Sequence, residues 1–280
     1  MTEPIDKIIN EFKPNMPQKN YGYIPDVIKE EDYILGGLTK LPTIVLQADG
    51  QWDKFIPEDE IQRNEFFDTY NCTGYGTLNA LEFLFKRLFG EKKNWSERYV
   101  GIAADTYPPG NSPQKVIETI RTECGLLDDF ILPLKGIKDV DEYYSPKPLP
   151  VLLTWKGEEF LEKYKVQHEW VFTPFTIDKK LALKEALQYS PIGISVHAWV
   201  KDPDTSFYIK PKGSQDNHWT VLYGYEKEKC WFIYDSYDST IKLLDWNYDF
   251  GQAKRYHITP IVKVGFWQII KNFFKKYQIN

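Results

Sequence analysis

The hydrophobic period of the sequence changes near residue 149, and this change limits the folds that the chain can adopt. Before it, apolar residues recur every three or four positions over residues 75–89, which is the period of a long buried helix ending at Gly90. A second helical stretch covers residues 113–123, where Ser112 provides the N-cap. The first half of the chain is therefore expected to be mainly helical.

After residue 149, short segments rich in β-branched and aromatic residues alternate with polar, proline or glycine turns. The expected strands are PVLLTW (150–155), EWVFTPFTI (169–177), GISVHAWV (193–200), FYIKPK (207–212), HWTVLYGY (218–225), CWFIYDSY (230–237) and TIKLLDW (240–246). One helix, residues 178–189, interrupts the series. Helices first and strands later predict an α+β protein instead of alternating strand–helix units.

This order of segments divides the chain into three parts. An N-terminal arm, residues 1–45, precedes a main domain, residues 46–262, and residues 263–280 form an amphipathic helix that docks on the body or on a partner. Within the main domain we expect a helical lobe at about residues 60–148 and a β lobe at about residues 149–262. Because ligand sites favour such interfaces, a functional cleft is expected between the lobes.

Charge and hydropathy exclude several classes of function. The 280 residues contain 35 Lys and Arg against 40 Asp and Glu, a net charge of −5, so no overall positive field would hold nucleic acid. The longest run without charges, residues 186–200, contains Pro191 and is too short for a transmembrane segment. The first residues lack the apolar stretch of a secretory signal, so we expect a cytoplasmic protein.

The three cysteines do not have the same expected role. The spacing of Cys72, Cys124 and Cys230 indicates neither a disulfide framework nor a zinc site, and no other pattern calls for a metal or a cofactor. Cys124 and Cys230 are expected to be small buried hydrophobes. Cys72 stands where the long helical period begins, and the unpaired N–H groups and dipole of a helix N-terminus lower the pKa of a thiol. Cys72 is therefore the candidate nucleophile.

His218 and Asp235 are the candidate base and the group that orients it. Of the four histidines, only His218 stands at the junction of a polar turn and a β segment. Asp235 ends the next expected strand, 17 residues later, so two adjacent strands can bring its carboxylate to the imidazole. This chemistry requires an accessible Cys72 sulfur close to the imidazole, and a sulfur sealed in the interior would contradict it.

The order and spacing of these residues resemble the papain-like cysteine peptidases, especially divergent members from bacteria and phages. His218 follows Cys72 by 146 residues, within the separation of about 130–150 residues typical of that family. Residues 218–225 are similar to the family's strand that begins with histidine and ends in Gly-Tyr, and Asp-Ser-Tyr-Asp at 235–238 resembles its Asn-Ser-Trp-Gly. Gly-Tyr-Ile-Pro-Asp at 22–26 resembles a lead-in common in bacterial relatives.

The resemblance implies a two-lobed fold and hydrolysis of peptide or protein substrates by Cys72, His218 and Asp235. It places four residues on the substrate groove, namely Gly110, Asn111, Trp219 and Tyr237. The family also has a glutamine six residues before the nucleophile, which donates a hydrogen bond to the oxyanion, but this chain has Phe66 there. Gln62, ten residues before Cys72, could take that role only if residues 64–68 were an insertion.

The missing glutamine and the absent Cys-Gly-Ser-Cys-Trp signature keep other interpretations open. Loss of one oxyanion donor costs about 10²–10³ in turnover. One alternative is therefore a papain-like scaffold that has lost catalysis and serves as a binding or structural protein, for instance in a phage particle, with a virion-associated location. A cell-wall amidase with the same Cys-then-His order is a third alternative, although such domains are more compact than a separation of 146 residues allows.

Overall fold

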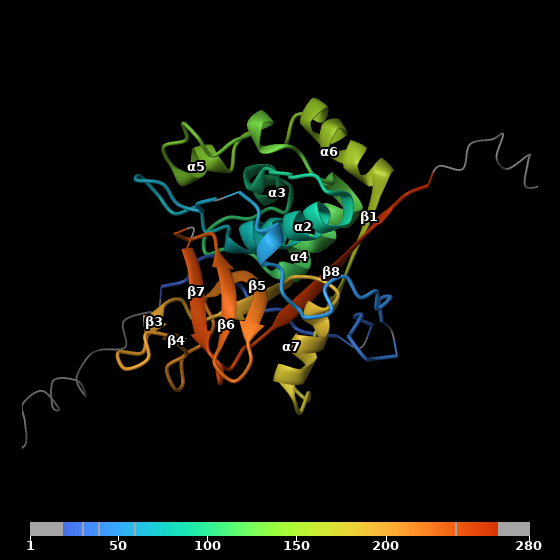
Figure 1. Ribbon diagram of the computed structural model, residues 1–280. Helices are drawn as coiled ribbons and strands as arrows, with labels where there is room; N and C mark the ends of the chain where they lie inside the picture. The colour runs from blue at the N-terminus through green and yellow to red at the C-terminus, as the bar shows by residue number, and fades with distance from the viewer. Residues whose placement is uncertain (1–18, 30, 39, 59, 239, 263–280) are drawn as a thin grey trace, which may run out of the picture.

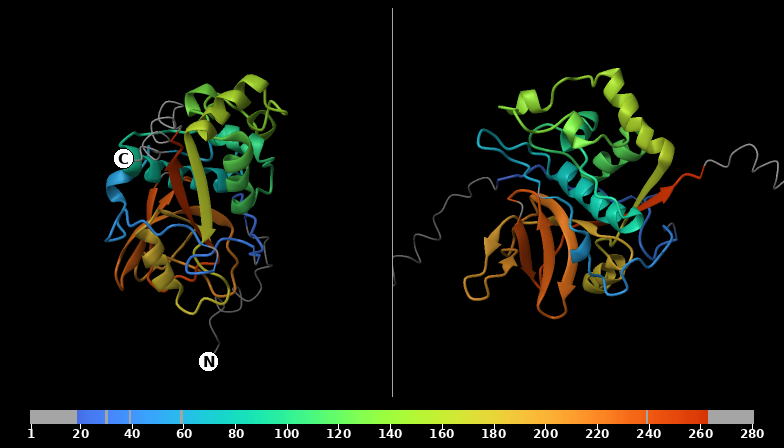
Figure 2. Two further views of the ribbon diagram at one scale, coloured as in Figure 1. Left: turned by 90° about the vertical axis from the view of Figure 1, so that its right-hand side faces the viewer. Right: turned by 45° about the horizontal axis from the view of Figure 1, so that its top comes forward.

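Figure 1 shows a computed structural model of the chain, which describes residues 19–262 except residues 30, 39, 59 and 239. The predicted amphipathic helix at 263–280 lies outside the described residues. Helices α2 to α6 gather on one side of the molecule, and strands β3 to β7 lie on the other side (Figures 1 and 2). The predicted α+β class is confirmed.

The helices follow most of the predicted helical stretches. Their bounds are α2 (Cys72–Phe89), α3 (Glu97–Ala103), α4 (Pro113–Thr119), α5 (Val140–Tyr143), α6 (Val151–Lys163) and α7 (Lys179–Leu187). The long helix ends as predicted at Gly90, which adopts the left-handed conformation and donates its N–H to the Lys86 carbonyl. Ser112 caps α4 by accepting the Lys115 N–H, and one π-helical turn, Ile120–Cys124, extends the helix.

Eight strands form one sheet in the described part of the chain. They are β1 (Tyr164–Trp170), β2 (Ile192–Val196), β3 (Val200–Lys201), β4 (Tyr208–Ile209), β5 (His218–Glu226), β6 (Cys230–Asp235), β7 (Thr240–Asp245) and β8 (Ala253–Pro260). Their order is β1-β8-β2-β5-β6-β7-β4-β3, and every pair is antiparallel except β4 with β7. The two strands expected to carry the base and its orienting group, β5 and β6, are direct neighbours.

Helix α2 lies at the centre of the fold. Every residue from Cys72 to Phe85 is buried, which is typical of a helix surrounded by other elements on all sides. It packs on β5, and at Gly76 the two elements nearly touch, since a Cβ built there would lie 2.8 Å from the Trp219 ring. This packing holds the start of α2 next to the start of β5.

Two sequence expectations about the second half are wrong. Residues 150–155, expected as a strand, instead begin helix α6, because a short apolar run cannot be assigned to helix or strand by its period. The downstream residues Gly157 and Phe160 are buried three apart, which is helical spacing. The strand expected at 169–177 shares only residues 169 and 170 with β1, which runs from Tyr164 to Trp170, and residues 171–177 are not a strand. In addition, β8 was not expected at all.

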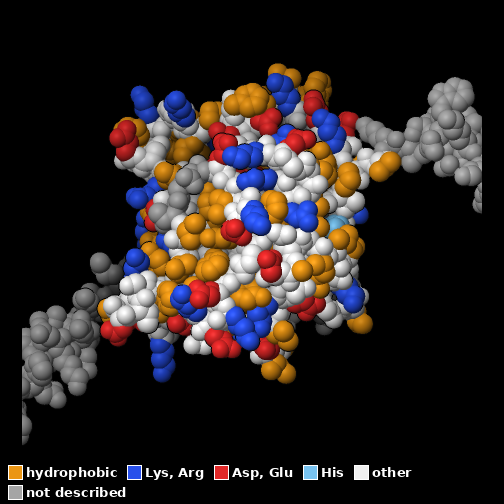
Figure 3. Space-filling model, in the orientation of Figure 1, with side chains coloured by type: hydrophobic (Ala, Val, Ile, Leu, Met, Phe, Trp, Pro, Cys, Tyr) orange, Lys and Arg blue, Asp and Glu red, His pale blue; other side chains and the backbone are white. Residues whose placement is uncertain are grey.

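The surface is mixed in charge. Figure 3 shows Lys and Arg side chains interspersed with Asp and Glu side chains over one face, without a continuous region of one sign. Among the described residues, no helix has the length and apolar character needed to cross a membrane.

Candidate active site

Cys72 is the first residue of α2, as the sequence predicted. The chain enters the helix through Tyr70, whose φ of 55° is unusual for a residue other than glycine. The Asn71 amide then donates to the Glu97 carbonyl at 2.9 Å and to the Tyr143 hydroxyl at 3.1 Å. These contacts fix the start of α2 against α3 and α5, so that the position of the sulfur is set by the helical part of the protein.

His218 and Asp235 meet where β5 begins and β6 ends. The distance from His218 Nε2 to Asp235 Oδ1 is 2.6 Å, and both side chains are fully buried. Burial disfavours the Asp235 carboxylate, but the charges and hydrogen bonds of His218 and Lys242 outweigh it and lower its pKa. The other imidazole nitrogen, Nδ1, is buried and has no hydrogen-bond partner. Asp235 thus orients the ring and leaves Nδ1 for another group.

The sulfur of Cys72 lies against the residue that follows His218. Cys72 forms a buried cluster with Tyr23 and Trp219, the residue that follows His218. The structure therefore brings together the starts of α2 and β5 and the end of β6, which carry the three residues singled out in the sequence. Cys72 and His218 are 146 residues apart in the sequence, and His218 and Asp235 are 17 residues apart.

The Cys72 thiol is not the exposed, acidic thiol that its place at a helix N-terminus predicted. Its exposed fraction is 0%, and burial raises its pKa well above the usual value. The hydrogen bond from the Trp219 backbone favours the thiolate but does not offset burial, and the charges of Asp68 and Asp235 oppose it further. In this conformation the thiol is sealed from solvent, so this conformation does not meet the requirement for an accessible sulfur and could not carry out the expected chemistry.

The chain's own residues 19–26, here called the cover segment, close the site. Tyr21 donates its N–H to the Asn217 carbonyl at 3.0 Å, just before His218. On the opposite side, Asn111 donates to the Gly22 carbonyl at 3.0 Å and accepts the Ile24 N–H at 2.9 Å, which makes a parallel β-bridge around Tyr23. The cover segment therefore spans from the sheet to the loop before α4.

Aromatic rings of the cover segment lie over the site. Tyr21 contacts the His218 ring edge to face at 5.5 Å between centroids, and Tyr237 contacts Tyr21 at 4.7 Å. Tyr23 stacks on Trp219 at 5.8 Å and is 3% exposed. These contacts exclude water from both the imidazole and the sulfur.

Gly22 is required by the close fit of the cover segment. Its φ is +112°, and a Cβ built on it would lie 2.1 Å from the Tyr70 carbonyl oxygen. A Cβ on Gly110 would meet the Gly22 carbonyl at the same distance. Any side chain at Gly22 would thus push the cover segment out of its place.

Gln62 lies at the site although it is ten residues before Cys72. Residues 64–67 form a turn closed by the Arg63–Asp68 bridge, and without these four residues Gln62 would stand six positions before Cys72. Its backbone donates to the Ser236 carbonyl at 2.8 Å, and its side-chain amide donates to the Tyr21 carbonyl at 2.8 Å. This turn brings Gln62 to the cover segment despite its distance from Cys72 along the chain.

All four predicted groove residues contact the cover segment. Gly110 and Asn111 lie against Gly22, Trp219 against Tyr23, and Tyr237 against Tyr21. The four residues predicted to line a groove are thus covered by the chain itself. The sequence did not predict the cover segment, although residues 22–26 resemble a lead-in common in bacterial relatives. It also did not predict a role for Lys242, a lone cation within an apolar β segment.

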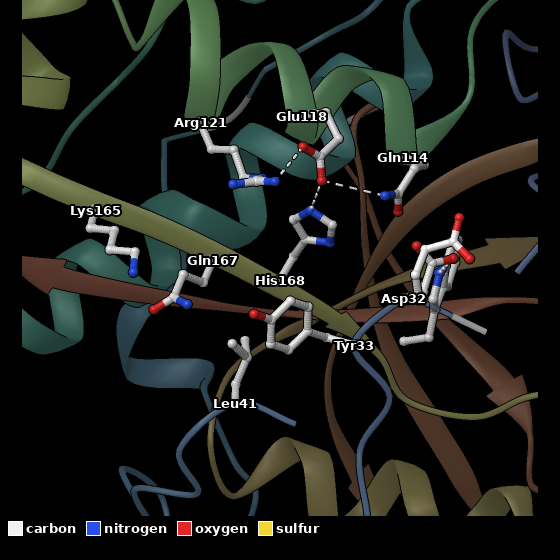
Figure 4. A pocket seen from close by; sticks show the side chains of 11 residues that line it. Asp32, Tyr33, Leu41, Gln114, Glu118, Arg121, Lys165, Gln167 and His168 are labelled. Atoms are coloured by element: carbon white, nitrogen blue, oxygen red, sulfur yellow. Dashed lines mark hydrogen bonds and ion pairs between the residues drawn. The ribbon is translucent and has the colours of Figure 1, made fainter. Parts of the chain in front are cut away.

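A separate pocket of about 250 Å³ lies between α4, β1 and the N-terminal arm (Figure 4). Three of its polar groups pair with one another: His168 Nε2 is 2.7 Å from Glu118 Oε1, and Arg121 forms an ion pair with Glu118 at 2.6 Å. None of the predicted site residues lines it. Among the described residues, no group of three or more His, Cys, Asp or Glu side chains is arranged to hold a metal ion.

No family model matches the sequence, and no curated protein matches it. Solved structures do match. Procathepsin L 3 from the larval midgut of Tenebrio molitor is 14% identical, with a TM-score of 0.54 over 79% of this chain and 73% of that chain. The proform of Amb a 11, a ragweed pollen cysteine protease, is 14% identical, with a TM-score of 0.51 over 80% of this chain and 68% of that one.

Bromelain from Ananas comosus, solved with the inhibitor E64, is 14% identical, with a TM-score of 0.50 over 76% of this chain and 98% of that chain. At this level of identity the similarity concerns the fold alone. The chain thus shares the fold of papain-like cysteine peptidases.

Proposed function

We propose that this chain is a papain-like cysteine peptidase, with its active site in a cleft between the helices and the sheet, and that the cover segment holds it in a latent form. The observation that carries the proposal is the state of the His218 ring. Nε2 is bound to Asp235, and Nδ1 is buried, unpartnered and next to the elements that carry Cys72. A nitrogen held in this way can act as a general base toward a thiol that comes within hydrogen-bond reach.

The chemistry follows once the cover segment leaves. His218 Nδ1 accepts the Cys72 proton, and the thiolate attacks the carbonyl carbon of a peptide bond. The imidazolium then gives its proton to the leaving amine as the C–N bond breaks, which leaves a thioester on Cys72. Water, deprotonated by His218, attacks the thioester, and the sulfur leaves with the proton returned to it. Asp235 keeps the Nε2–H in place throughout.

Gln62 and the Cys72 backbone N–H are the proposed donors to the oxyanion that forms in both steps. The Gln62 amide donates to a backbone carbonyl of the cover segment, which is chemically the same group that a peptide substrate would present. The backbone of Asn111 supports the same interpretation, because it binds the cover segment as an extended peptide through both its N–H and its carbonyl.

Latency accounts for the buried thiol. The cover segment is held over the site by backbone hydrogen bonds and ring contacts, and two of the similar structures are named as a proenzyme and a proform. Its departure would expose Cys72 and remove the main cause of the raised pKa, which is burial. The helix N-terminus and His218 would then favour the thiolate, as the sequence predicted.

The sealed sulfur also favours a second candidate function, a papain-like scaffold that binds a partner without catalysis. In that case the cover segment would be a permanent part of the structure. The two functions differ in what happens to Cys72 when the segment is displaced, and this difference can be measured without knowing the substrate.

The test uses the full chain with Gly22→Val, which cannot place the cover segment against Tyr70. Near pH 6, we expect iodoacetamide to label Cys72 at least about tenfold faster than in the parent chain, with Cys124 and Cys230 unchanged. The added substitution His218→Ala should abolish the gain. A peptide-library digest should show cleavage by the Gly22→Val chain and none after Cys72→Ala.

Gly36→Val is the matched control, because Gly36 also has a positive φ, +73°, in the same arm, but no atom lies within 4 Å of its Cβ position. It should leave the labelling of Cys72 slow. Limited proteolysis should show that residues 19–26 are released in Gly22→Val. If they are released and Cys72 still reacts as slowly as Cys124, the peptidase proposal fails and the scaffold function is favoured.

A further inference from the structure

Lys242 takes an inner position of β7 that the hydrophobic pattern would give to an apolar residue. It is 1% exposed, while its neighbours Ile241 and Leu243 are 53% and 37% exposed. Because side chains alternate across a strand, a shift of one residue would bury both neighbours and expose the lysine. The observed register thus buries the Lys242 ammonium and leaves two apolar side chains exposed. This indicates that the charge of Lys242 has a function.

The ammonium binds the carboxylate that holds the imidazole. Lys242 Nζ donates to Asp235 Oδ2 at 2.7 Å, and Asp235 Oδ1 lies 2.6 Å from His218 Nε2. Since an ionised carboxylate only accepts hydrogen bonds, Nε2 donates to Asp235 and Nδ1 is the nitrogen left for another group. Each oxygen of Asp235 therefore has one partner, and the carboxylate cannot rotate without breaking both contacts.

Two aromatic rings enclose the lysine and link it to the histidine. The Trp199 and Tyr208 rings lie 4.9 Å and 5.9 Å from Lys242 Nζ, within the range of cation–π contacts. Trp199 also contacts the His218 ring edge to face at 5.7 Å. The lysine is thus part of the wall of the site, and it touches neither Cys72 nor the groove residues in any described contact.

Other titratable groups face this cluster from the neighbouring segments. Asp238, in the turn after β6, also binds Lys242 but is partly exposed, with a side-chain exposure of 37%. The remaining groups are Cys72 on α2, Tyr237 after β6, Lys19 and Tyr21 in the cover segment, and Asp68 beside it. Among these, Lys242 is the cation in direct contact with Asp235.

We propose that Lys242 is a positioning residue that neutralises Asp235, so that the pair acts on His218 as one uncharged hydrogen-bond acceptor. This inference rests on the proposed function. The resemblance places a neutral asparagine at the position of Asp235, and Asp235 with Lys242 reproduces its hydrogen bond and its net charge. A carboxylate alone would stabilise the imidazolium and hold the proton that must pass to the leaving amine.

The test follows protonation of the His218 ring by NMR in the full chain, which does not depend on peptidase activity. In Lys242→Met we expect the midpoint of the His218 titration to rise by about one pH unit or more, because an unshared negative charge remains next to the ring. In Asp235→Asn combined with Lys242→Met the midpoint should return to within about 0.3 units of the parent value.

Lys210→Met is the matched control, because Lys210 forms an ion pair of 2.6 Å with Asp216, and both side chains are largely buried. It should leave the His218 midpoint unchanged. Lys242→Arg should keep the parent midpoint, since it preserves the charge. Should Lys242→Met fail to fold, Lys242→Gln provides the same comparison while keeping a donor toward Asp235. An unchanged midpoint in a folded, uncharged variant overturns the proposal, even if that variant is less stable.

The two proposals can fail separately. A shifted His218 midpoint with no cleavage by Gly22→Val would support Lys242 as the residue that neutralises Asp235 and would count against the peptidase. Cleavage with no shift in Lys242→Met would support the peptidase and reduce Lys242 to a packing role.

Discussion

Arg255 and Glu169 form an ion pair inside the protein that ties the N-terminal arm to the sheet. Arg255 on β8 is 1% exposed and binds Glu169 on β1, which is fully buried. The second Glu169 oxygen accepts the Leu41 N–H at 2.7 Å, and Arg255 also donates to the Leu41 and Pro42 carbonyls. One pair of charges therefore satisfies the buried backbone where the arm crosses the sheet.

Arg255→Met should lower the free energy of unfolding by about 3–5 kcal/mol, because it leaves the Glu169 carboxylate buried without a cation. Urea denaturation followed by fluorescence measures this change. Arg121→Met is the control: its ion pair with Glu118 is partly exposed, at 38% and 33%, so the loss should stay below about 1 kcal/mol. Equal losses in the two variants would contradict the role given to the buried pair.

At the scale of elements, the contact between α2 and β5 sets the geometry of the site. Gly76 → Ala would normally stabilise a helix interior by about 0.5–1 kcal/mol. Here the added methyl group would lie 2.8 Å from the Trp219 ring and 3.2 Å from the Trp219 carbonyl. We expect a net loss of about 1–3 kcal/mol in urea denaturation, because the two elements must move apart. A gain in stability would show that the contact is looser than described.

The elements with a clear period or cap were predictable from the sequence. Helix α2 was identified by its apolar spacing and by Gly90, and β5 and β6 by their aromatic and β-branched residues. Helix α6 was mistaken for a strand because its first residues, Val151 and Leu152, are an apolar run exposed on a helix. Local propensity says little about such a segment, because tertiary contacts decide its state.

The candidate site was predictable only in part, for a similar reason. The sequence separations of Cys72, His218 and Asp235 pointed to one location. The cover segment could not be predicted, because its place depends on backbone hydrogen bonds to Asn111 and Asn217, which are more than 80 residues away in the sequence. The contact of Lys242 with Asp235 likewise could not be predicted, because it depends on the register of β7 against β6.

At the scale of the whole molecule, three carboxyl groups are buried where the helices meet. Glu60, Glu82 and Glu97 are 8% exposed or less, and burial raises the pKa of each, that of Glu97 to about 7. Glu82 accepts the Trp95 N–H at 2.8 Å. In the folded protein these groups keep their protons at pH values where the unfolded chain loses them.

This difference makes stability depend on pH. Below pH 4.5 the Glu97 carboxyl is protonated in both states, and between about pH 4.5 and 7 only the unfolded state ionises, so the folded state loses stability as pH rises. Glu97→Gln should remove the part of this slope that Glu97 contributes, with a gain over the parent chain on the order of 3 kcal/mol at pH 7 and little gain at pH 4. Denaturation at a series of pH values measures it.

Glu159→Gln is the control for this prediction, because Glu159 lies on the exposed face of α6, with a side-chain exposure of 65%. Its stability difference from the parent chain should not vary with pH over the same range. If Glu97→Gln behaves like Glu159→Gln, the carboxyl group of Glu97 reaches solvent in the folded protein.

In the latent peptidase that we propose, the cover segment belongs to the same polypeptide as the groove it would fill, so dilution cannot release it. A tethered strand competes at an effective concentration of about millimolar, whereas a free peptide competes only at its own concentration. Peptides in solution would therefore bind to the groove slowly and incompletely, at a rate set by how often the cover segment releases it spontaneously. Cutting the chain between the segment and the sheet would convert this permanent competitor into one that diffuses away.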